Sequence, residues 1–140
     1  MKLVRIAAIT TLVFLALSSI AGAVPLIADP SGQMIHMPLS LLRHSPFTSF
    51  LIPGIILFAA NGLLCLWVLW MTWKKRPGYP LFVVGQGIVL AGWLIVEIIM
   101  LQVIVNLHYF YGVIALILVV TGLRLGRMKE RVGPSPSVRD

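Results

Sequence analysis

Glu97 is the one acidic side chain that lies inside a long apolar stretch of the chain. A carboxylate is expensive to place in hydrocarbon, so an acid in a transmembrane segment normally faces the interior of a helix bundle and is a functional candidate. Two interpretations are open: Glu97 is a proton or cation site, or it is a protonated or hydrogen-bonded group that holds helices together. We expect no second acid and no basic partner at its depth, which favours the second interpretation.

Asn61 and Gln86 are amide side chains within apolar stretches. Positions seven and eleven residues apart nearly coincide on a helix that turns by about 100° per residue. Gln86, Trp93 and Glu97 are therefore expected on one stripe of a single helix. Asn61 is expected at mid-depth of the second helix, where it can hydrogen-bond across to the third helix, which carries Gln86. Both amides are interpreted as polar contacts between helices.

A further set of candidates lies at the expected outer face: Asp29, His36, His44, His108, Tyr109 and Tyr111. Zinc needs three or four ligands with supporting partners, and this set has no HExxH-like spacing. Haem held by two histidines needs them on facing helices, whereas His36 and His44 fall in a loop. The tyrosines are typical of the aromatic belt at a membrane interface. We therefore predict no metal and no cofactor.

Sequence motifs of common enzymes are absent. The chain has no P-loop, no GxGxxG pattern and no serine, histidine and aspartate that can be argued to form a triad. Cys65, the only cysteine, excludes an intramolecular disulfide and lies in an apolar stretch, as a small buried side chain would. The prediction is a protein that is not an enzyme.

Four apolar stretches must position these residues, at 6–25, about 50–73, 81 to about 105 and 109–123. About 20 helical residues cross the hydrocarbon core, and a spanning segment must satisfy its own backbone hydrogen bonds. Unbroken apolar runs lack the alternation of barrel strands. We predict an all-α, transmembrane four-helix bundle with helices at about 5–25, 49–73, 80–105 and 108–125.

These helices are assigned to one membrane domain, residues 1–132, followed by a disordered cytoplasmic tail at 133–140. Small residues of the third helix are expected to let helices approach closely: Gly85, Ala91 and Gly92. Other residues are expected at about the depth of Glu97: Ser18, Ser19, Gly54 and Gly112.

Composition and charge agree with a membrane protein. The chain is 59% hydrophobic and 11% charged, whereas a soluble domain carries roughly 25% charged residues. The net charge of +7 comes from clusters beside apolar stretches, without an aromatic and basic groove, so nucleic acid is not an expected partner. The bilayer is the expected partner.

The basic residues also predict the orientation. With four spans, all Lys and Arg except Arg43 fall on one side of the membrane, which the positive-inside rule makes cytoplasmic. Both termini are therefore predicted in the cytoplasm, and a loop of about 24 residues, Leu26 to Ser49, outside. Candidates to bind lipid headgroups follow from the same clusters: Lys74, Lys75, Arg76, Arg124, Arg127, Lys129 and Arg131.

The N-terminal stretch allows two interpretations. Lys2, Arg5, an apolar segment and then Ala21-Gly22-Ala23 resemble a secretory signal peptide with a cleavage site. Cleavage after Ala23 would leave three helices. The apolar run continues through Ile27, which favours a retained first helix.

Turn residues divide the remaining elements. Asp29-Pro30-Ser31-Gly32 predicts a turn, and Ser45-Pro46 resembles the N-cap and first position of the second helix. Pro53-Gly54 is expected to kink this helix or to mark its true start. The segment Lys74 to Pro80 predicts a tight turn between antiparallel helices.

The sequence resembles small bacterial four-helix integral membrane proteins of unassigned function. The residues that carry the resemblance are Asp29-Pro30-Ser31-Gly32, Pro38, Ser45-Pro46-Phe47, Leu51-Ile52-Pro53-Gly54, Asn61-Gly62, Trp93 to Glu97 and Tyr111-Gly112. The resemblance covers most of the membrane region and neither terminus. It implies a protein of the bacterial inner membrane with four spans, and it implies no activity.

Two functions are therefore expected. The first is a non-enzymatic accessory, structural or interaction subunit, with a second copy of the chain or another membrane protein as its partner. The alternative is a component of proton-coupled or ion and solute transport that uses Glu97.

Overall fold

A computed structural model of the protein describes residues 2–102 and 104–132, with the side chains of residues 35 and 129–132 left aside. The described part contains helices and no strand. Its elements are α1 (Lys2–Ala28), the short 3₁₀ helices Gln33–Ile35 and Leu39–Leu42, α2 (Leu51–Leu57), a π-helical segment (Phe58–Leu63), α3 (Leu64–Trp73), α4 (Tyr79–Leu101) and α5 (Asn106–Val132). The predicted tail at 133–140 lies outside the described residues.

Four helices of the described chain are long and apolar enough to cross a membrane: Lys2–Ala28, Leu51–Trp73, Tyr79–Leu101 and Asn106–Met128. The second of these is continuous through α2, the π-helical segment and α3. In an apolar stretch of 18 residues in each helix, no more than 33% of the residues are buried inside the molecule. Most of each apolar surface therefore faces outward, as a lipid environment requires, and the protein is an all-α bundle of four candidate membrane-spanning helices.

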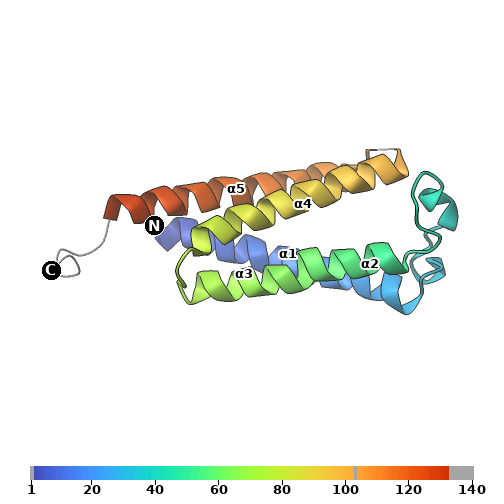
Figure 1. The fold of residues 1–140 in the computed structure, drawn as a ribbon, viewed down its shortest axis with the longest axis horizontal. Coiled ribbons are helices and arrows are strands. Elements are labelled where there is room, and N and C mark those ends of the chain that lie inside the picture. Colours follow the sequence, from blue (N-terminus) through green and yellow to red (C-terminus); the bar gives the residue numbers. More distant parts are fainter. Residues whose placement is uncertain (1, 103, 133–140) are drawn as a thin grey trace.

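The four helices are arranged around a common core (Figure 1). α1 packs against α5 and against the α2–α3 rod, and α4 packs against α5 and α3. The core between them contains mainly small and aliphatic side chains, such as Ala8, Leu12, Val68, Leu90 and Leu118. The start of α1 and the end of α5 lie at one end of the bundle, and the long loop before α2 lies at the other. We call these the basic end and the loop end.

The closest helix contact joins α4 and α5. A Cβ atom built on Gly87 would lie 2.8 Å from the carbonyl oxygen of Ala115, and one on Gly122 would lie 2.8 Å from the amide nitrogen of Val84. Glycine at these positions lets the two backbones meet, as in other membrane helix pairs. For contacts inside the molecule the expectation for Gly85 and Gly92 was wrong, because no atom of another helix lies within 4 Å of a Cβ at either position.

The loop before α2 folds over the loop end. Asp29 accepts hydrogen bonds from the Ser31 hydroxyl and from the Met34 amide, the latter at 2.9 Å. These bonds lower the pKa of the Asp29 carboxyl below its ordinary value. Gly32 adopts φ +77°, and a Cβ there would lie 2.3 Å from the carbonyl oxygen of Met37. The predicted turn therefore requires glycine at this position.

The start of α2 differs from the prediction. Ser45 and Pro46 lie in turns of the loop, and α2 begins at Leu51, so they do not form its N-cap and first position. The Ser45 hydroxyl donates instead to the carbonyl oxygen of Leu42, at 2.9 Å. Pro53 falls within the first turn of α2, where a missing N–H group costs no helical hydrogen bond. Phe50, just before the helix, is buried with Leu26 and Leu42.

At the basic end, a turn of five residues joins α3 to α4. Lys75 and Gly78 adopt positive φ angles of 53° and 80°, and the Arg76 amide donates to the carbonyl oxygen of Met71 at 2.9 Å. Arg5 of α1 donates to the carbonyl oxygens of Thr72 and Trp73, at 3.3 and 3.4 Å. These carbonyls end α3 and lack helical partners, so Arg5 ties the start of α1 to this turn.

The glycine contact gives a prediction with its own control. Gly87→Ala is expected to lower the free energy of unfolding by about 1–3 kcal/mol relative to Gly92→Ala, because only the first Cβ meets neighbouring backbone. Both variants gain the same helix propensity on α4, so the difference isolates the contact. The measurement is unfolding in mixed micelles of increasing sodium dodecyl sulfate content. Equal stability of the two variants would contradict the close α4–α5 packing.

Candidate functional site

The turn between α4 and α5 brings Glu97 and His108 together. α4 ends at Leu101 because Gln102 adopts a left-handed conformation with φ 58°, and α5 begins at Asn106. Antiparallel helices place residues at similar distances from their connection at the same depth. His108 Nε2 lies 3.4 Å from Glu97 Oε2, and among the side chains that the structure describes no other basic group lies within 4.0 Å of a carboxylate.

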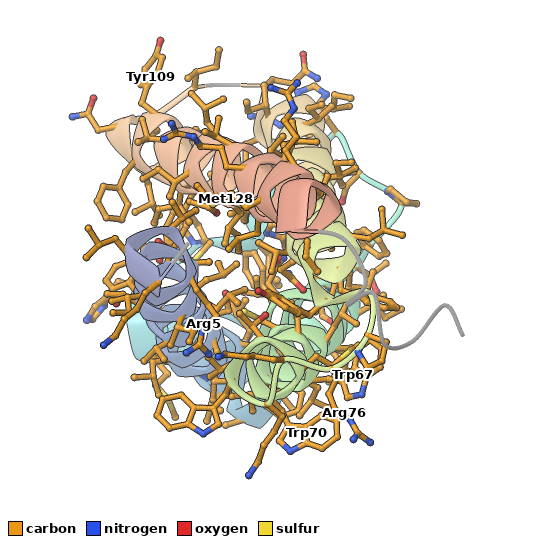
Figure 2. All side chains as sticks on the ribbon, turned by 90° about the vertical axis from the view of Figure 1, so that its left-hand side faces the viewer. Arg5, Trp67, Trp70, Arg76, Tyr109 and Met128 are labelled. Carbon is orange, nitrogen blue, oxygen red and sulfur yellow. The ribbon has the colours of Figure 1, made fainter. Side chains whose placement is uncertain are left out.

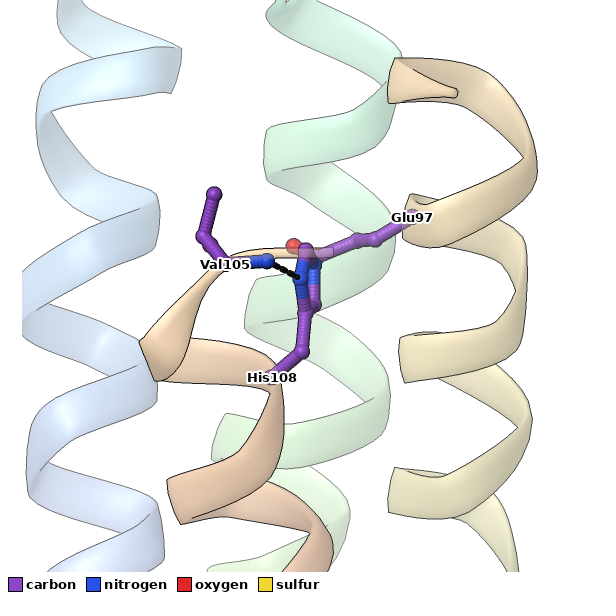
Figure 3. A network of polar contacts seen from close by, with 3 residues as sticks. All are labelled: Glu97, Val105 and His108. Carbon is purple, nitrogen blue, oxygen red and sulfur yellow. Dashed lines mark hydrogen bonds and ion pairs between the residues drawn. The ribbon is translucent and has the colours of Figure 1, made fainter. Parts of the chain in front are cut away.

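The second ring nitrogen of His108 is also engaged. The Val105 amide donates to His108 Nδ1 at 3.1 Å (Figure 3). A ring nitrogen that accepts a hydrogen bond carries no proton, so the neutral imidazole has its proton on Nε2, which faces Glu97. Protonation of Nδ1 would break the bond to Val105. The arrangement therefore leaves the Glu97 carboxyl as the group that can exchange a proton without loss of a hydrogen bond.

The Glu97–His108 contact is loose. A well-formed N–H···O bond has a donor–acceptor distance of roughly 2.7–3.2 Å, and this one is 3.4 Å. The His108 side chain is 5% exposed and that of Glu97 is 29% exposed. The carboxyl group therefore has open surface on which a water molecule, an ion or a small ligand can compete with the imidazole.

That open surface belongs to a cavity of about 130 Å³ between α1, α2, α4 and α5. Its polar lining comprises Ser18, Ser19, Glu97 and His108, with Tyr111 beside them. The apolar lining is Gly22, Leu57, Leu90, Trp93, Leu94 and Leu107. A cavity of this size with these polar groups in its lining has room for a few water molecules or a small ion. We call it the Glu97 cavity.

One expectation for Glu97 was wrong. The sequence predicted no basic partner at its depth, and it predicted a third helix that continues to about residue 105. α4 ends about one turn earlier, at Leu101. The turn between α4 and α5 therefore begins closer to Glu97, and the first turn of α5, which contains His108, lies at the same depth as Glu97. Ser18 and Ser19 line the Glu97 cavity as their predicted depth implied, whereas Gly54 and Gly112 are not part of its lining.

A second polar site lies deeper in the bundle, in the π-helical segment Phe58–Leu63. Gln86 Nε2 donates to the carbonyl oxygen of Ala60 at 3.1 Å and to Asn61 Oδ1 at 3.3 Å. The predicted contact from Asn61 across to the next helix is thereby confirmed. A π-helical turn misaligns carbonyl groups relative to an α-helix, and the Ala60 carbonyl accepts from Gln86. No pattern in the sequence predicted the π-helical segment.

Part of each amide in this second site is left without a partner. Asn61 and Gln86 are 0% and 1% exposed, and neither Asn61 Nδ2 nor Gln86 Oε1 has a hydrogen-bond partner among the described atoms. One is a donor and the other an acceptor, so a single bridging water would satisfy both. Gln86 lies one helical turn from Leu90, which lines the Glu97 cavity.

The outer-face candidates do not form one site. His108 and Tyr111 line the Glu97 cavity. Tyr109 is 67% exposed and points away from the bundle (Figure 2). Asp29 is bonded within its own turn. His36 lies on a separate shallow hollow of the loop, and His44 is exposed.

The described basic side chains, apart from Arg43 in the loop, gather at the basic end, as their clusters in the sequence implied. Arg76 packs over the Trp70 ring, 5.1 Å from its centroid, and Trp67 and Trp70 lie on the outside of α3 near it (Figure 2). Lys74, Lys75, Arg124 and Arg127 are exposed. The side chains of Lys129 and Arg131 lie outside the described residues. Arg5, which the sequence did not single out, bonds α3 instead of facing lipid.

Metal ligands are not grouped in the described part of the chain. No three His, Cys, Asp or Glu residues in residues 2–102 and 104–132 lie close enough to hold a metal ion. The Glu97–His108 pair supplies two such groups and no third.

No family model, curated protein or solved structure matches the chain. The resemblance to small bacterial four-helix membrane proteins therefore stays a prediction.

The second polar site gives a prediction for stability. Interhelical hydrogen bonds in membrane proteins contribute about 0.6 kcal/mol on average and at most about 1.7. In a double-mutant cycle of Asn61→Ala and Gln86→Ala, we expect a coupling energy in this range, because the two amides bond directly. Unfolding in mixed micelles measures it. Strictly additive effects would show that the amides do not stabilise each other.

Proposed function

We propose that this protein is a non-enzymatic, multi-pass membrane protein that takes up and releases a proton at Glu97, as a component of proton-coupled transport of an ion or small solute. The observation that carries the proposal is the Glu97–His108 pair on a cavity inside the helix bundle. Intramembrane carboxyl and imidazole groups of this kind commonly mark proton and ion pathways.

Proton exchange at this pair changes the charge of the cavity. His108 is neutral while Val105 donates to its Nδ1, so the site is anionic when Glu97 is ionised and neutral when it is protonated. An anionic cavity with two serine hydroxyls favours a cation, and a neutral one does not. Binding of a cation and binding of a proton at Glu97 therefore compete, which is the basic requirement for exchange of one for the other.

The cavity lies toward the loop end of the bundle. Ser18, Ser19 and Gly22 come from the second half of α1, and Leu107 and His108 from the first turn of α5. Leu90 and Leu94 form part of its lining on α4 and are buried. Access from the loop side is the shorter route, so proton exchange is proposed to occur with the compartment on that side.

The location proposed for the chain is the bacterial cytoplasmic membrane, with both termini in the cytoplasm. The support is the concentration of Lys and Arg at the basic end, together with the resemblance in sequence. In this orientation the loop end and the Glu97 cavity face the outside of the cell.

A second candidate function is that of an accessory or interaction subunit. The outward face of α4 supports it, because Gly85 and Gly92 leave open space beside the exposed side chains of Ile88 and Ile95. A helix of a second copy or of another membrane protein can approach such a face closely. An accessory subunit would show no proton-dependent behaviour of its own when it is reconstituted alone.

Replacing Glu97 by Gln tests the proposed function. The protein is reconstituted into liposomes that contain a pH-sensitive dye, and a potassium diffusion potential drives protons inward. We expect wild-type liposomes to acidify faster than protein-free ones, and Glu97→Gln to fall to the protein-free rate, because glutamine keeps the shape and cannot ionise. Infrared spectra of the same samples should show a pH-dependent carboxyl band that is absent in Glu97→Gln and has a moved midpoint in His108→Leu.

Asp29→Asn is the matched control, since Asp29 is an acid at the same end of the bundle and lies outside the cavity. Its acidification rate should equal that of the wild type. Wild-type rates no faster than protein-free liposomes, together with a carboxyl band that does not respond to pH, would leave the accessory function as the better proposal.

The intact mass of the purified protein tests whether the first helix is retained. Ala8, Leu12 and Leu15 of α1 are completely buried in the core, and Ser18 and Ser19 line the Glu97 cavity. Cleavage after Ala23 would remove all of them. We therefore expect a mature chain of 15.4 kDa, and a mass that lacks residues 1–23 would contradict both the retained helix and the cavity.

A further inference from the structure

A shallow groove runs along the contact between α4 and α5 near the basic end. Its lining is Pro80, Leu81, Val84, Gly122, Leu123, Gly126 and Arg127, and its volume is about 390 Å³. The groove exists because two of its α5 positions, 122 and 126, are glycines without side chains. At Gly122 the helices touch, with Pro80 and Val84 as neighbours, whereas a Cβ on Gly126 would find only the Pro80 Cβ, at 3.9 Å.

The groove faces the membrane. Leu81 is 73% exposed and Leu123 is 50% exposed, and both side chains belong to helices that are apolar enough to span a bilayer. Exposed apolar side chains at this depth are covered by lipid. The residues that line the groove extend over about one helical turn of α4 and of α5, roughly 6 Å. This length fits the part of a lipid next to its headgroup and is too short for a whole acyl chain.

One rim of the groove is positively charged. Arg127 is exposed, and no carboxylate lies within ion-pair distance of it among the side chains that the structure describes. Lys74, Lys75 and Arg76 lie in the turn before α4. Of the acids, Asp29 and Glu97 lie toward the loop end, and the side chain of Glu130, three residues after Arg127, lies outside those that the structure describes.

The start of α4 adds to the positive potential. Pro80 and Leu81 lie in its first turn, and the helix has no side-chain cap at its N-terminus. The positive end of the α4 dipole therefore points toward the groove. A negatively charged headgroup at this rim would meet both the dipole and the Arg127 guanidinium.

We propose that this groove is a binding site for an anionic glycerophospholipid, whose phosphate pairs with Arg127 while the upper part of an acyl chain lies over Gly122 and Gly126. Basic pockets between transmembrane helices at the cytoplasmic interface commonly bind such headgroups. The site is independent of proton exchange at Glu97, at the other end of the bundle. It would hold α4 and α5 together at the point where their backbones meet.

The test is lipid binding to the full chain in an uncharged detergent, measured by native mass spectrometry with phosphatidylglycerol and phosphatidylcholine of identical chains. The wild type should bind phosphatidylglycerol more tightly. Arg127→Gln should weaken phosphatidylglycerol binding about fivefold, the usual effect of one basic residue at an anionic surface, and leave phosphatidylcholine binding unchanged. Gly126→Leu fills the groove and should weaken the binding of both lipids.

Arg124→Gln is the matched control, because Arg124 is an exposed arginine on α5 that does not line the groove. It should bind phosphatidylglycerol as the wild type does. Equal losses in Arg124→Gln and Arg127→Gln would overturn the proposal in favour of diffuse attraction between charges. Wild-type affinity in Gly126→Leu would overturn it as well, and so would displacement of the lipid by millimolar inorganic phosphate. Arg127 is exposed, so its replacement tests the site even if Gly126→Leu fails to fold.

Discussion

The contact between α4 and α5 fixes the geometry on which the proposed sites depend. Gly87 and Gly122 have no side chain, so the backbones of α4 and α5 can approach each other closely at these two positions. This contact fixes how far α5 is shifted along its axis relative to α4. Glu97 and His108 face each other because of that register. The groove at Gly126 is a product of the same packing, since the helices diverge one turn beyond Gly122.

The bilayer explains where the polar groups lie. Hydrocarbon offers no hydrogen bonds, so polar side chains within the spans turn toward one another or toward their own helices. Gln86 bonds the Ala60 carbonyl that the π-helical segment presents, Thr72 bonds the Val68 carbonyl, and Arg5 bonds the end of α3. Glu97 differs from these groups because it borders a cavity and has a loose partner. That difference is the reason to assign it a function rather than a purely structural role.

The two ends of the bundle have different chemistry. The loop end carries the described acids, Asp29 and Glu97, together with His108, and its loop is tied down by the Asp29 turn and by the cluster around Phe50. The basic end carries exposed cations and three exposed tryptophans, Trp67, Trp70 and Trp73. The proposed proton site at one end and the proposed lipid site at the other are compatible, because they use different residues and different faces of the α4–α5 pair.

The sequence by itself determined the class of fold. Apolar runs of spanning length permit only helices that satisfy their own backbones, and this local requirement predicts four helices and a turn at Asp29 without knowledge of packing. It also identified Glu97, Asn61 and Gln86, because polar residues in apolar runs are conspicuous. Only the tertiary structure decided which residues meet. The pairing of Glu97 with His108 depends on where α4 ends, a difference of about one turn that hydropathy does not resolve. Likewise Gly87 and Gly122, not Gly85 and Gly92, form the close contact. The choice depends on which face of α4 meets its neighbour, and apart from the stripe with Gln86 and Glu97 that helix is apolar on every side.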